Sequence, residues 1–200
     1  MTLRTKVLLL RKTPYGETSV VAACLSPDSG RVDLMLKGAK RIGSRKYPVA
    51  DLFRELEVEL SDAGKNSSLR SPRSIDLLAQ FDSIAASPDA YSAACSVSSL
   101  LLRSSAPDTP APMLYAAARE AFRKLAEGAS PEDVLWLLRL VNLEEHGVLP
   151  ESPTPEGRAL ARSLSLAGRG LAPPPEVDAE KETAIKSWLE TLSKKEGFER

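Results

Sequence analysis

The chain of 200 residues is charge-balanced, with 27 Lys and Arg against 27 Asp and Glu, and 42% of its residues are hydrophobic. This is the composition of a globular protein of one domain or two small ones, long enough to bury a core without a disulfide or metal staple. The two cysteines, Cys24 and Cys95, form no CxxC pair, which excludes a Cys-rich zinc site and argues against a disulfide scaffold. We expect both to be reduced and buried, because both lie in apolar runs. The N-terminus has four consecutive apolar residues before the next charge, too few for a secretory signal or a membrane span, so we expect a cytoplasmic protein.

The first 80 residues read as strands. Turn signals separate five segments rich in aliphatic and β-branched residues. The predicted strands are 4–12, 18–26, 31–37, 52–60 and 69–78. In the third strand, Val32, Leu34 and Leu36 alternate with Arg31, Asp33, Met35 and Lys37, which indicates one buried and one wet face. In the fourth, Leu56, Val58 and Leu60 are opposed to Glu55, Glu57 and Glu59, which we expect on a solvated face. Five short strands of this kind predict a small closed barrel.

From about residue 81 the pattern becomes helical. Four helix starts are predicted by a hydroxyl residue followed by proline, the pattern of an N-cap and a first helical position. These pairs are Ser87-Pro88, Thr109-Pro110, Ser130-Pro131 and Thr154-Pro155. Gly128, Gly147 and Gly168 are the predicted residues just after three helix ends. The helix after Pro131 is apolar nearly all round, which predicts that it is central in its bundle. A fifth helix is expected from near Asp178, after the Pro-rich segment 170–182.

Few residues suggest catalysis. The single histidine, His146, precedes Gly147 at a predicted helix end, where capping is its expected role. The chain has no phosphate-binding loop of the GxxxxGK[ST] type and no GxGxxG motif. Glu55, Glu57 and Glu59 could bind a metal, but a solvated strand face is far more common. We therefore expect no enzyme, no cofactor and no metal site.

Charge is distributed unevenly along the chain. Residues 1–80 hold 14 Lys and Arg against 9 Asp and Glu, a net charge of +5, and the remainder holds 13 against 18, a net charge of −5. This charge asymmetry favours a basic module that binds an anionic polymer, joined to a more acidic module with another function. Chance asymmetry is the alternative.

The stretch LKGAKRIGSRKYP, residues 36–48, concentrates five cations within ten residues and no acid. Cations neutralise phosphates and release counterions, glycines let the backbone approach closely, and Tyr47 could stack on a base. The alternative to nucleic-acid binding is an ordinary solvated loop whose charges only increase solubility. The candidate nucleic-acid-binding residues, including neighbours on the first and third strands, are Arg31, Lys37, Lys40, Arg41, Arg45, Lys46, Arg11, Lys12 and Tyr47.

Several motifs together resemble the bacterial recombination mediator family RecO. Tyr15-Gly16-Glu17-Thr18 resembles the turn after that family's first strand, and Ser26 to Gly30 resembles its second turn. Lys37-Gly38-Ala39-Lys40-Arg41, with Ser44 after it, resembles its Lys-Gly-Ala-Arg-Arg stretch. VLWLLRLVNLEEHGVLPE resembles its long apolar helix. The resemblance covers residues 4–150 and ends after Pro150, where many members carry a four-cysteine zinc insertion that this sequence lacks.

The resemblance implies an α+β protein, with a five-stranded OB-fold barrel over residues 1–80 followed by an α-helical domain over 81–200, without a zinc finger. It implies binding of single- and double-stranded DNA without base specificity, and annealing of complementary strands. It also implies RecR, the C-terminal tail of single-stranded-DNA-binding protein (SSB) and, indirectly, the RecA recombinase as partners, and a nucleoid-associated protein.

Two other functions stay open at this point. The barrel could be a scaffold in a protein-interaction adaptor, whose apolar helices offer a groove for a short acidic and hydrophobic peptide. An RNA-binding OB-fold protein would have the same pattern of charge. The Tyr-Gly-Glu and Lys-Gly-Ala motifs favour DNA repair over the RNA alternative.

Overall fold

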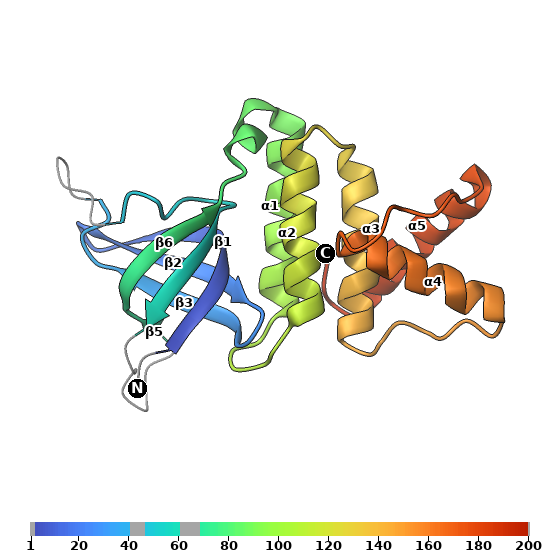
Figure 1. The fold of residues 1–200 in the computed structure, drawn as a ribbon, viewed down its shortest axis with the longest axis horizontal. Helices are drawn as coiled ribbons and strands as arrows, with labels where there is room; N and C mark the ends of the chain where they lie inside the picture. The colour runs from blue at the N-terminus through green and yellow to red at the C-terminus, as the bar shows by residue number, and fades with distance from the viewer. Residues whose placement is uncertain (1–2, 41–46, 61–68, 200) are drawn as a thin grey trace. The chain divides into compact units, whose positions relative to one another are not determined.

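The structure is a computed structural model that describes residues 3–40, 47–60 and 69–199. The chain forms two compact units, Met1–Asp82 with Ser105–Tyr115, and Ser83–Ser104 with Ala116–Arg200. The first unit contains a curled β-sheet and the second is helical (Figure 1). The predicted fold class, an OB-fold barrel followed by α-helices, is confirmed. Assignment of nucleic-acid binding to residues 1–80 stays a prediction.

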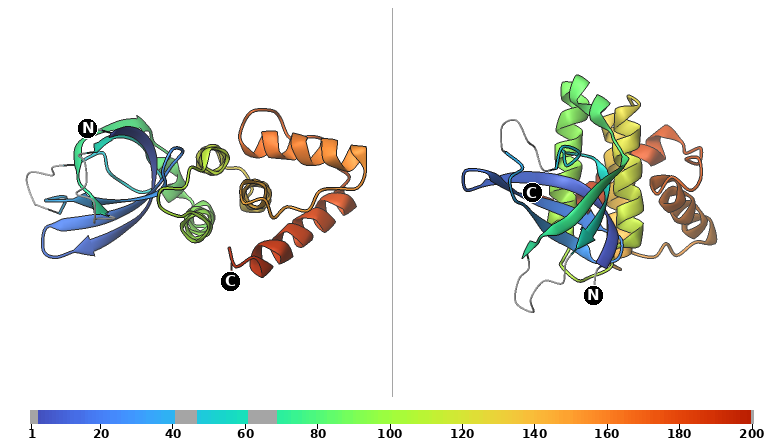
Figure 2. Two further views of the ribbon diagram at one scale, coloured as in Figure 1. Left: turned by 90° about the horizontal axis from the view of Figure 1, so that it is seen from below. Right: turned by 60° about the vertical axis from the view of Figure 1, so that its left-hand side comes forward.

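The described residues of the first unit form six strands in one sheet, in the order β5-β3-β2-β1-β4-β6. Their bounds are β1 Leu3–Tyr15, β2 Ser19–Ser26, β3 Gly30–Leu36, β4 Glu55–Leu60, β5 Leu69–Arg70 and β6 Pro72–Ala79. The predicted fifth strand is interrupted at Ser71 and so appears as β5 and β6. Because β5 pairs in parallel with β3 and β6 pairs antiparallel with β4, the sheet closes on itself. The left view of Figure 2 shows the strands curling round a centre.

Alternation along the strands places one face of the sheet in the barrel core, as predicted. Val32, Leu34 and Leu36 of β3 are buried, and the inward residues of β4 are completely so. Adjacent strands add further small and aliphatic side chains to the same cluster. Its buried members are Val7, Leu9, Val20, Ala22, Cys24, Val32, Leu34, Leu36, Ala50, Leu56, Val58 and Leu60.

The predicted start of the fourth strand is wrong, because β4 begins at Glu55 rather than at residue 52. Phe53 has a φ of 60°, in the left-handed region, which interrupts an extended strand. The Phe53 amide donates to the Leu9 carbonyl at 2.9 Å, and the Leu9 amide donates to the Arg54 carbonyl at 3.0 Å. The two hydrogen bonds lie next to a β-bulge in β1, between Leu9 and Arg11. Beyond the bulge, β1 and β2 continue as a hairpin.

The prediction that Glu55, Glu57 and Glu59 lie on a solvated face is wrong for Glu55. Glu55 is 5% exposed, and its Oε1 accepts a hydrogen bond of 2.9 Å from the Tyr115 hydroxyl. Glu57 is half-buried and pairs with Arg4. A buried carboxylate requires a polar partner, and Tyr115 supplies one from far along the chain.

Residues 105–115 belong to the first unit although they follow a helix of the second. The Arg31 amide donates to the Ala106 carbonyl at 3.1 Å, and the Ala111 amide donates to the Pro27 carbonyl at 3.0 Å. The helix predicted from Thr109-Pro110 is therefore wrong in its start: α2 runs Pro112–Ala126, because the preceding backbone is held against the β2–β3 turn.

The described residues of the second unit contain most of α2, the other four α-helices and a short 3-10 helix. Their bounds are η1 Asp82–Ala86, α1 Pro88–Ser104, α3 Pro131–Glu145, α4 Pro155–Gly168 and α5 Ala179–Lys195. Helix α3 packs against α1, α4 and α5, which confirms its predicted central place. Its Arg139 is satisfied by Glu199, with Nε to Oε2 at 2.7 Å.

The helix ends follow the predicted chemistry only in part. The Ser87 and Thr154 hydroxyls accept hydrogen bonds from the Ala90 and Gly157 amides, whereas Ser130 makes no side-chain cap. Gly128 and Gly147 have positive φ angles, as predicted. Gly168 is instead the last residue of α4, and the left-handed residue is Gly170.

His146 caps α3, as expected. Its Nδ1 and Nε2 lie 2.7 Å from the carbonyl oxygens of Asn142 and Ser104, so the ring joins the C-terminal ends of α3 and α1.

The cysteine prediction is half wrong. Cys24 is buried in the barrel core, where burial raises the pKa of its thiol far above the ordinary value. Cys95 is exposed on α1. Among the helices of the described segments, none is long and apolar enough to cross a membrane.

Candidate nucleic-acid interface

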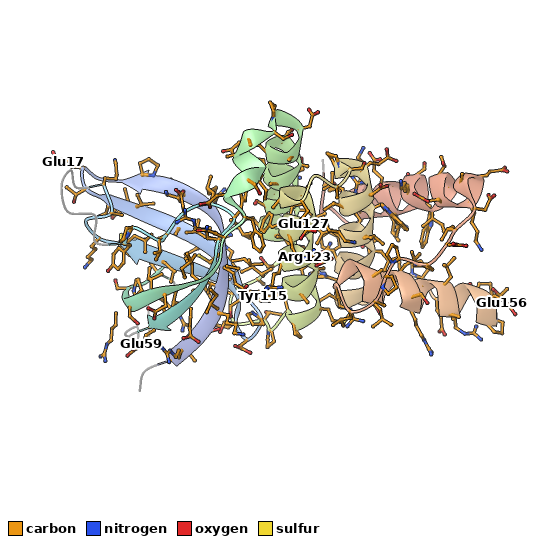
Figure 3. The ribbon with its side chains drawn as sticks, turned by 45° about the horizontal axis from the view of Figure 1, so that its top comes forward. Glu17, Glu59, Tyr115, Arg123, Glu127 and Glu156 are labelled. Atoms are coloured by element: carbon orange, nitrogen blue, oxygen red, sulfur yellow. The ribbon has the colours of Figure 1, made fainter. Side chains whose placement is uncertain are left out.

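The β1–β2 hairpin forms one side of a pocket in the first unit. The end of β1 pairs with β2 from Pro14 opposite Val20 to Tyr15 opposite Ser19, and Figure 3 marks the hairpin tip at Glu17. The Lys40 amide donates to the Thr18 carbonyl at 2.9 Å, which ties the segment after β3 to the hairpin turn. Residues 47–51 complete the pocket, which has a volume of about 400 Å³. Its lining residues are Lys12, Pro14, Val20, Leu36, Ala39, Lys40, Tyr47, Pro48, Ala50 and Asp51.

The nine predicted binding residues divide into groups. Lys12, Lys40 and Tyr47 come together in this pocket. Arg11, Arg31 and Lys37 lie on β1, on β3 and just after β3, outside the pocket lining. Arg41, Arg45 and Lys46 lie outside the described residues.

Three of the predicted cations are exposed and have no acidic partner in the ranges that the structure describes: Arg11, Lys37 and Lys40. The Lys40 ammonium makes only a long contact, 3.4 Å, to the Gly16 carbonyl. Such cations can neutralise phosphates without first breaking an ion pair.

Two other predicted cations are already neutralised. Lys12 Nζ lies 2.9 Å from Oδ1 of Asp51, and Arg31 pairs with Asp33 on the same strand, with Nη2 to Oδ2 at 3.1 Å. Burial opposes ionisation of Asp51. The hydrogen bonds from Lys12 and from the Leu52 amide, with the charges of Lys12 and Arg54, outweigh burial and hold the pKa of the Asp51 carboxyl below its ordinary value.

Tyr47 is a fixed wall of the pocket rather than a protruding ring. Its side chain is half-buried against the barrel core, and its hydroxyl donates to the Pro72 carbonyl at 3.4 Å. The floor consists of the core residues Val20, Leu36 and Ala50. The pocket thus combines apolar walls with charged groups.

Of the ten residues that line the pocket, sequence reasoning named three as binding residues, and Pro14, Pro48 and Asp51 are among those that it missed. Asp51 could have been noticed as the first acid after five cations, but its pairing with Lys12 depends on the fold.

The outer surface of β1, β4 and β6 has mixed charge. Arg4 pairs with Glu57, Nε to Oε2 at 3.0 Å, and lies 3.9 Å from Asp76. No group of three or more His, Cys, Asp or Glu able to hold a metal occurs within the described segments.

Comparison with known proteins finds several relatives that share one description. The family model described as "Recombination protein O N terminal" matches residues 1–81. The DNA repair protein RecO of Burkholderia pseudomallei is 34% identical over 139 residues, 70% of this chain and 49% of that protein. The RecO proteins of Aliivibrio fischeri and Bacillus subtilis are 29% and 25% identical over 142 and 144 residues. The chain is similar to the RecO family over about 70% of its length.

The match to the RecO family extends beyond the barrel into the helices, since the alignments cover 71% and 72% of the chain for the last two relatives. The chain spans a little over half the length of these two RecO proteins, 58% and 55%. The family resemblance inferred from the Tyr-Gly-Glu-Thr and Lys-Gly-Ala-Lys-Arg motifs is thereby confirmed.

Proposed function

We propose that this chain is a non-enzymatic mediator of DNA repair and homologous recombination that binds single- and double-stranded DNA without sequence specificity. The observation that carries the proposal is the pocket in which Lys40 and Tyr47 meet. Arg11 and Lys37, which have no acidic partner among the described residues, adjoin the lining residues Lys12 and Leu36 in the sequence. Cations that track phosphates together with an aromatic wall are the two elements of sequence-tolerant single-strand binding. Similarity to the RecO family supports the same role.

Strand annealing follows from the same charges. A basic surface that neutralises two strands lowers the repulsion between their phosphates while their bases pair. Arg41, Arg45 and Lys46, which lie outside the described residues, stay predicted contributors, and Arg31 and Lys12 contribute when their acidic partners release them. The protein then works at the nucleoid with RecR, binds the SSB tail and helps to load RecA on SSB-coated DNA.

The helical unit offers a second candidate function, the protein-interaction adaptor. A pocket of about 710 Å³ is lined in part by Val134, Trp136 and Leu137 of α3 and by Pro174. Its charged lining residues are Arg123, Lys124, Glu127, Asp133, Glu176 and Glu182. Four carboxylates against two cations favour a peptide that is neutral or basic, so we do not assign the SSB tail to this pocket.

The DNA proposal is tested by titrating dye-labelled single-stranded DNA, with RNA of the same sequence in parallel, at two salt concentrations. Lys37→Glu/Lys40→Glu should weaken DNA binding strongly, and each lost phosphate contact should lower the salt slope by about 0.7. Lys181→Glu/Lys195→Glu, which changes two exposed lysines of α5 by the same charge, is the matched control. Equal affinity of the barrel variant and the wild type at low salt would remove this surface from the proposal, and preference for RNA would favour the RNA-binding alternative.

A further inference from the structure

The barrel pocket has the shape and chemistry of a small-molecule site rather than of a simple phosphate groove. Its volume of about 400 Å³ lies within the range of such sites, roughly 300–1,000 Å³. The floor is made of core side chains, and Pro14, Tyr47 and Pro48 add ring-shaped apolar walls. A flat, partly apolar ligand fits such walls better than a phosphate does.

The walls are held in place before any ligand arrives. The Tyr47 hydroxyl is bonded to the Pro72 carbonyl, and the Ala50 amide donates to the Tyr47 carbonyl at 3.2 Å. The Asp51 amide donates to the Val49 carbonyl at 3.0 Å. A pre-formed cavity saves the entropy of ordering its side chains on binding.

Asp51 supplies a hydrogen-bond acceptor at this pocket. Its Oδ1 accepts from Lys12 Nζ at 2.9 Å and from the Leu52 amide at 2.8 Å. Its Oδ2 has no hydrogen-bond partner in the part of the chain that the structure describes, and the side chain is 56% exposed. The lowered pKa keeps this carboxylate ionised at neutral pH, so Oδ2 can accept from a ligand N–H.

Lys40 supplies the complementary charge. Lys40 lines the same pocket, and its ammonium has no acidic partner among the described residues. A ligand that joins a planar ring bearing an N–H donor to a phosphate would satisfy Asp51 and Lys40 together. A nucleotide has this combination of groups.

We propose that this pocket binds one unstacked base of a single DNA strand and prefers bases with an exocyclic amino group. The inference rests on the proposed DNA-binding function and adds a base-recognition subsite to it. Asp51 accepts from the amino group of cytosine or adenine, whereas thymine has no exocyclic amino group. The one donor of thymine, its ring N3–H, lies between two carbonyl oxygens that would face the carboxylate unfavourably. Tyr47 and the two prolines enclose the ring, and Lys40 holds the adjoining phosphate.

The test compares oligodeoxycytidine and oligodeoxythymidine of equal length, titrated against the full chain. The wild type should bind oligodeoxycytidine about fivefold or more tightly. Asp51→Ala should reduce this ratio to about one without weakening oligodeoxythymidine binding, because it also releases Lys12. Asp33→Ala is the matched control: it frees Arg31 from a similar pair outside the pocket and should leave the ratio unchanged.

The outcomes separate the two proposals. No binding of either strand would sink the proposed function, whereas equal binding of both strands by the wild type would overturn only the base pocket. Circular dichroism establishes that each variant is folded. If Asp51→Ala fails to fold, the wild type is titrated with cytidine or thymidine monophosphate and followed by NMR. Selective shifts of the Tyr47 and Ala50 amides with cytidine monophosphate support the pocket, and their absence overturns it.

Discussion

The hydroxyl of Tyr115 donates a 2.9 Å hydrogen bond to Oε1 of Glu55, and the two side chains are only 7% and 5% exposed. Tyr115→Phe removes this donor from a buried carboxyl while keeping the ring. We expect the free energy of unfolding to fall by about 1–3 kcal/mol. Chemical denaturation followed by circular dichroism measures the change. Tyr15→Phe, at an exposed ring of the hairpin, serves as control and should change stability by no more than about 0.5 kcal/mol.

Gly30 should not tolerate a side chain. Its φ is 60°, and an added Cβ would collide with the carbonyl oxygens of Ala106 and Thr109. Gly30→Ala should therefore lower the free energy of unfolding by more than the roughly 1–3 kcal/mol of left-handed strain alone. Gly16→Ala has nearly the same φ, 57°, but open space around it, and isolates the strain. Equal thermal unfolding temperatures for the two variants would contradict the close approach of residues 106–109.

Asp82 should make the first unit sensitive to acid. Hydrogen bonds from the Arg54 guanidinium, at 2.6 and 3.0 Å, lower the pKa of the Asp82 carboxyl despite partial burial. Because the folded pKa lies below the unfolded value of about 3.9, the pair stabilises the fold above about pH 4 and loses its effect as pH falls through the folded pKa.

Asp82→Asn should thus lower the free energy of unfolding by about 0.5–1 kcal/mol at neutral pH. The loss is modest because the carboxylate is about half exposed. The difference from wild type should vanish at low pH. Denaturation across a pH series measures this dependence. Glu17→Gln at the hairpin tip is the control, and a difference between Asp82→Asn and wild type that is independent of pH would be inconsistent with this account.

Glu199 should anchor the end of the chain's last helix to α3. Its carboxylate and the Arg139 guanidinium form two hydrogen bonds, 2.7 and 3.0 Å, and the side chains are 18% and 14% exposed. Glu199→Ala leaves a largely buried cation without this partner, so we expect a loss of about 1–3 kcal/mol and faster amide hydrogen exchange in α5. Glu196→Ala, at an exposed neighbour, should affect neither measurement.

Local patterns predicted most of the fold because the forces that they report are local. The alternation of Val32, Leu34 and Leu36 has the period of a strand with one buried face. Pro131 and Pro155 begin helices because proline fixes the backbone of a first helical residue. Pro110 satisfies the same rule, but tertiary hydrogen bonds hold the backbone before it and delay α2 to Pro112.

The site was predictable in residue type but not in geometry. Lys12 and Arg31 were identified as cations, yet nothing local indicates that Asp51 and Asp33 neutralise them. Glu55 has the same sequence pattern as Glu57 and Glu59, and its burial depends on Tyr115, 60 residues away. The pocket exists only because three separate segments converge: the hairpin, residues 36–40 and residues 47–51.

The inclusion of residues 105–115 in the first unit has a consequence for synthesis. The Arg31 amide, the Pro27 carbonyl and the Glu55 carboxyl bond to partners in or at the end of this segment. A chain emerging from the ribosome has all the strands of the barrel long before it has these partners, because α1 is made in between. The barrel therefore gains these last contacts only after α1 has been translated, and a fragment cut just after β6 would retain its strands but leave the Glu55 carboxyl without its Tyr115 partner.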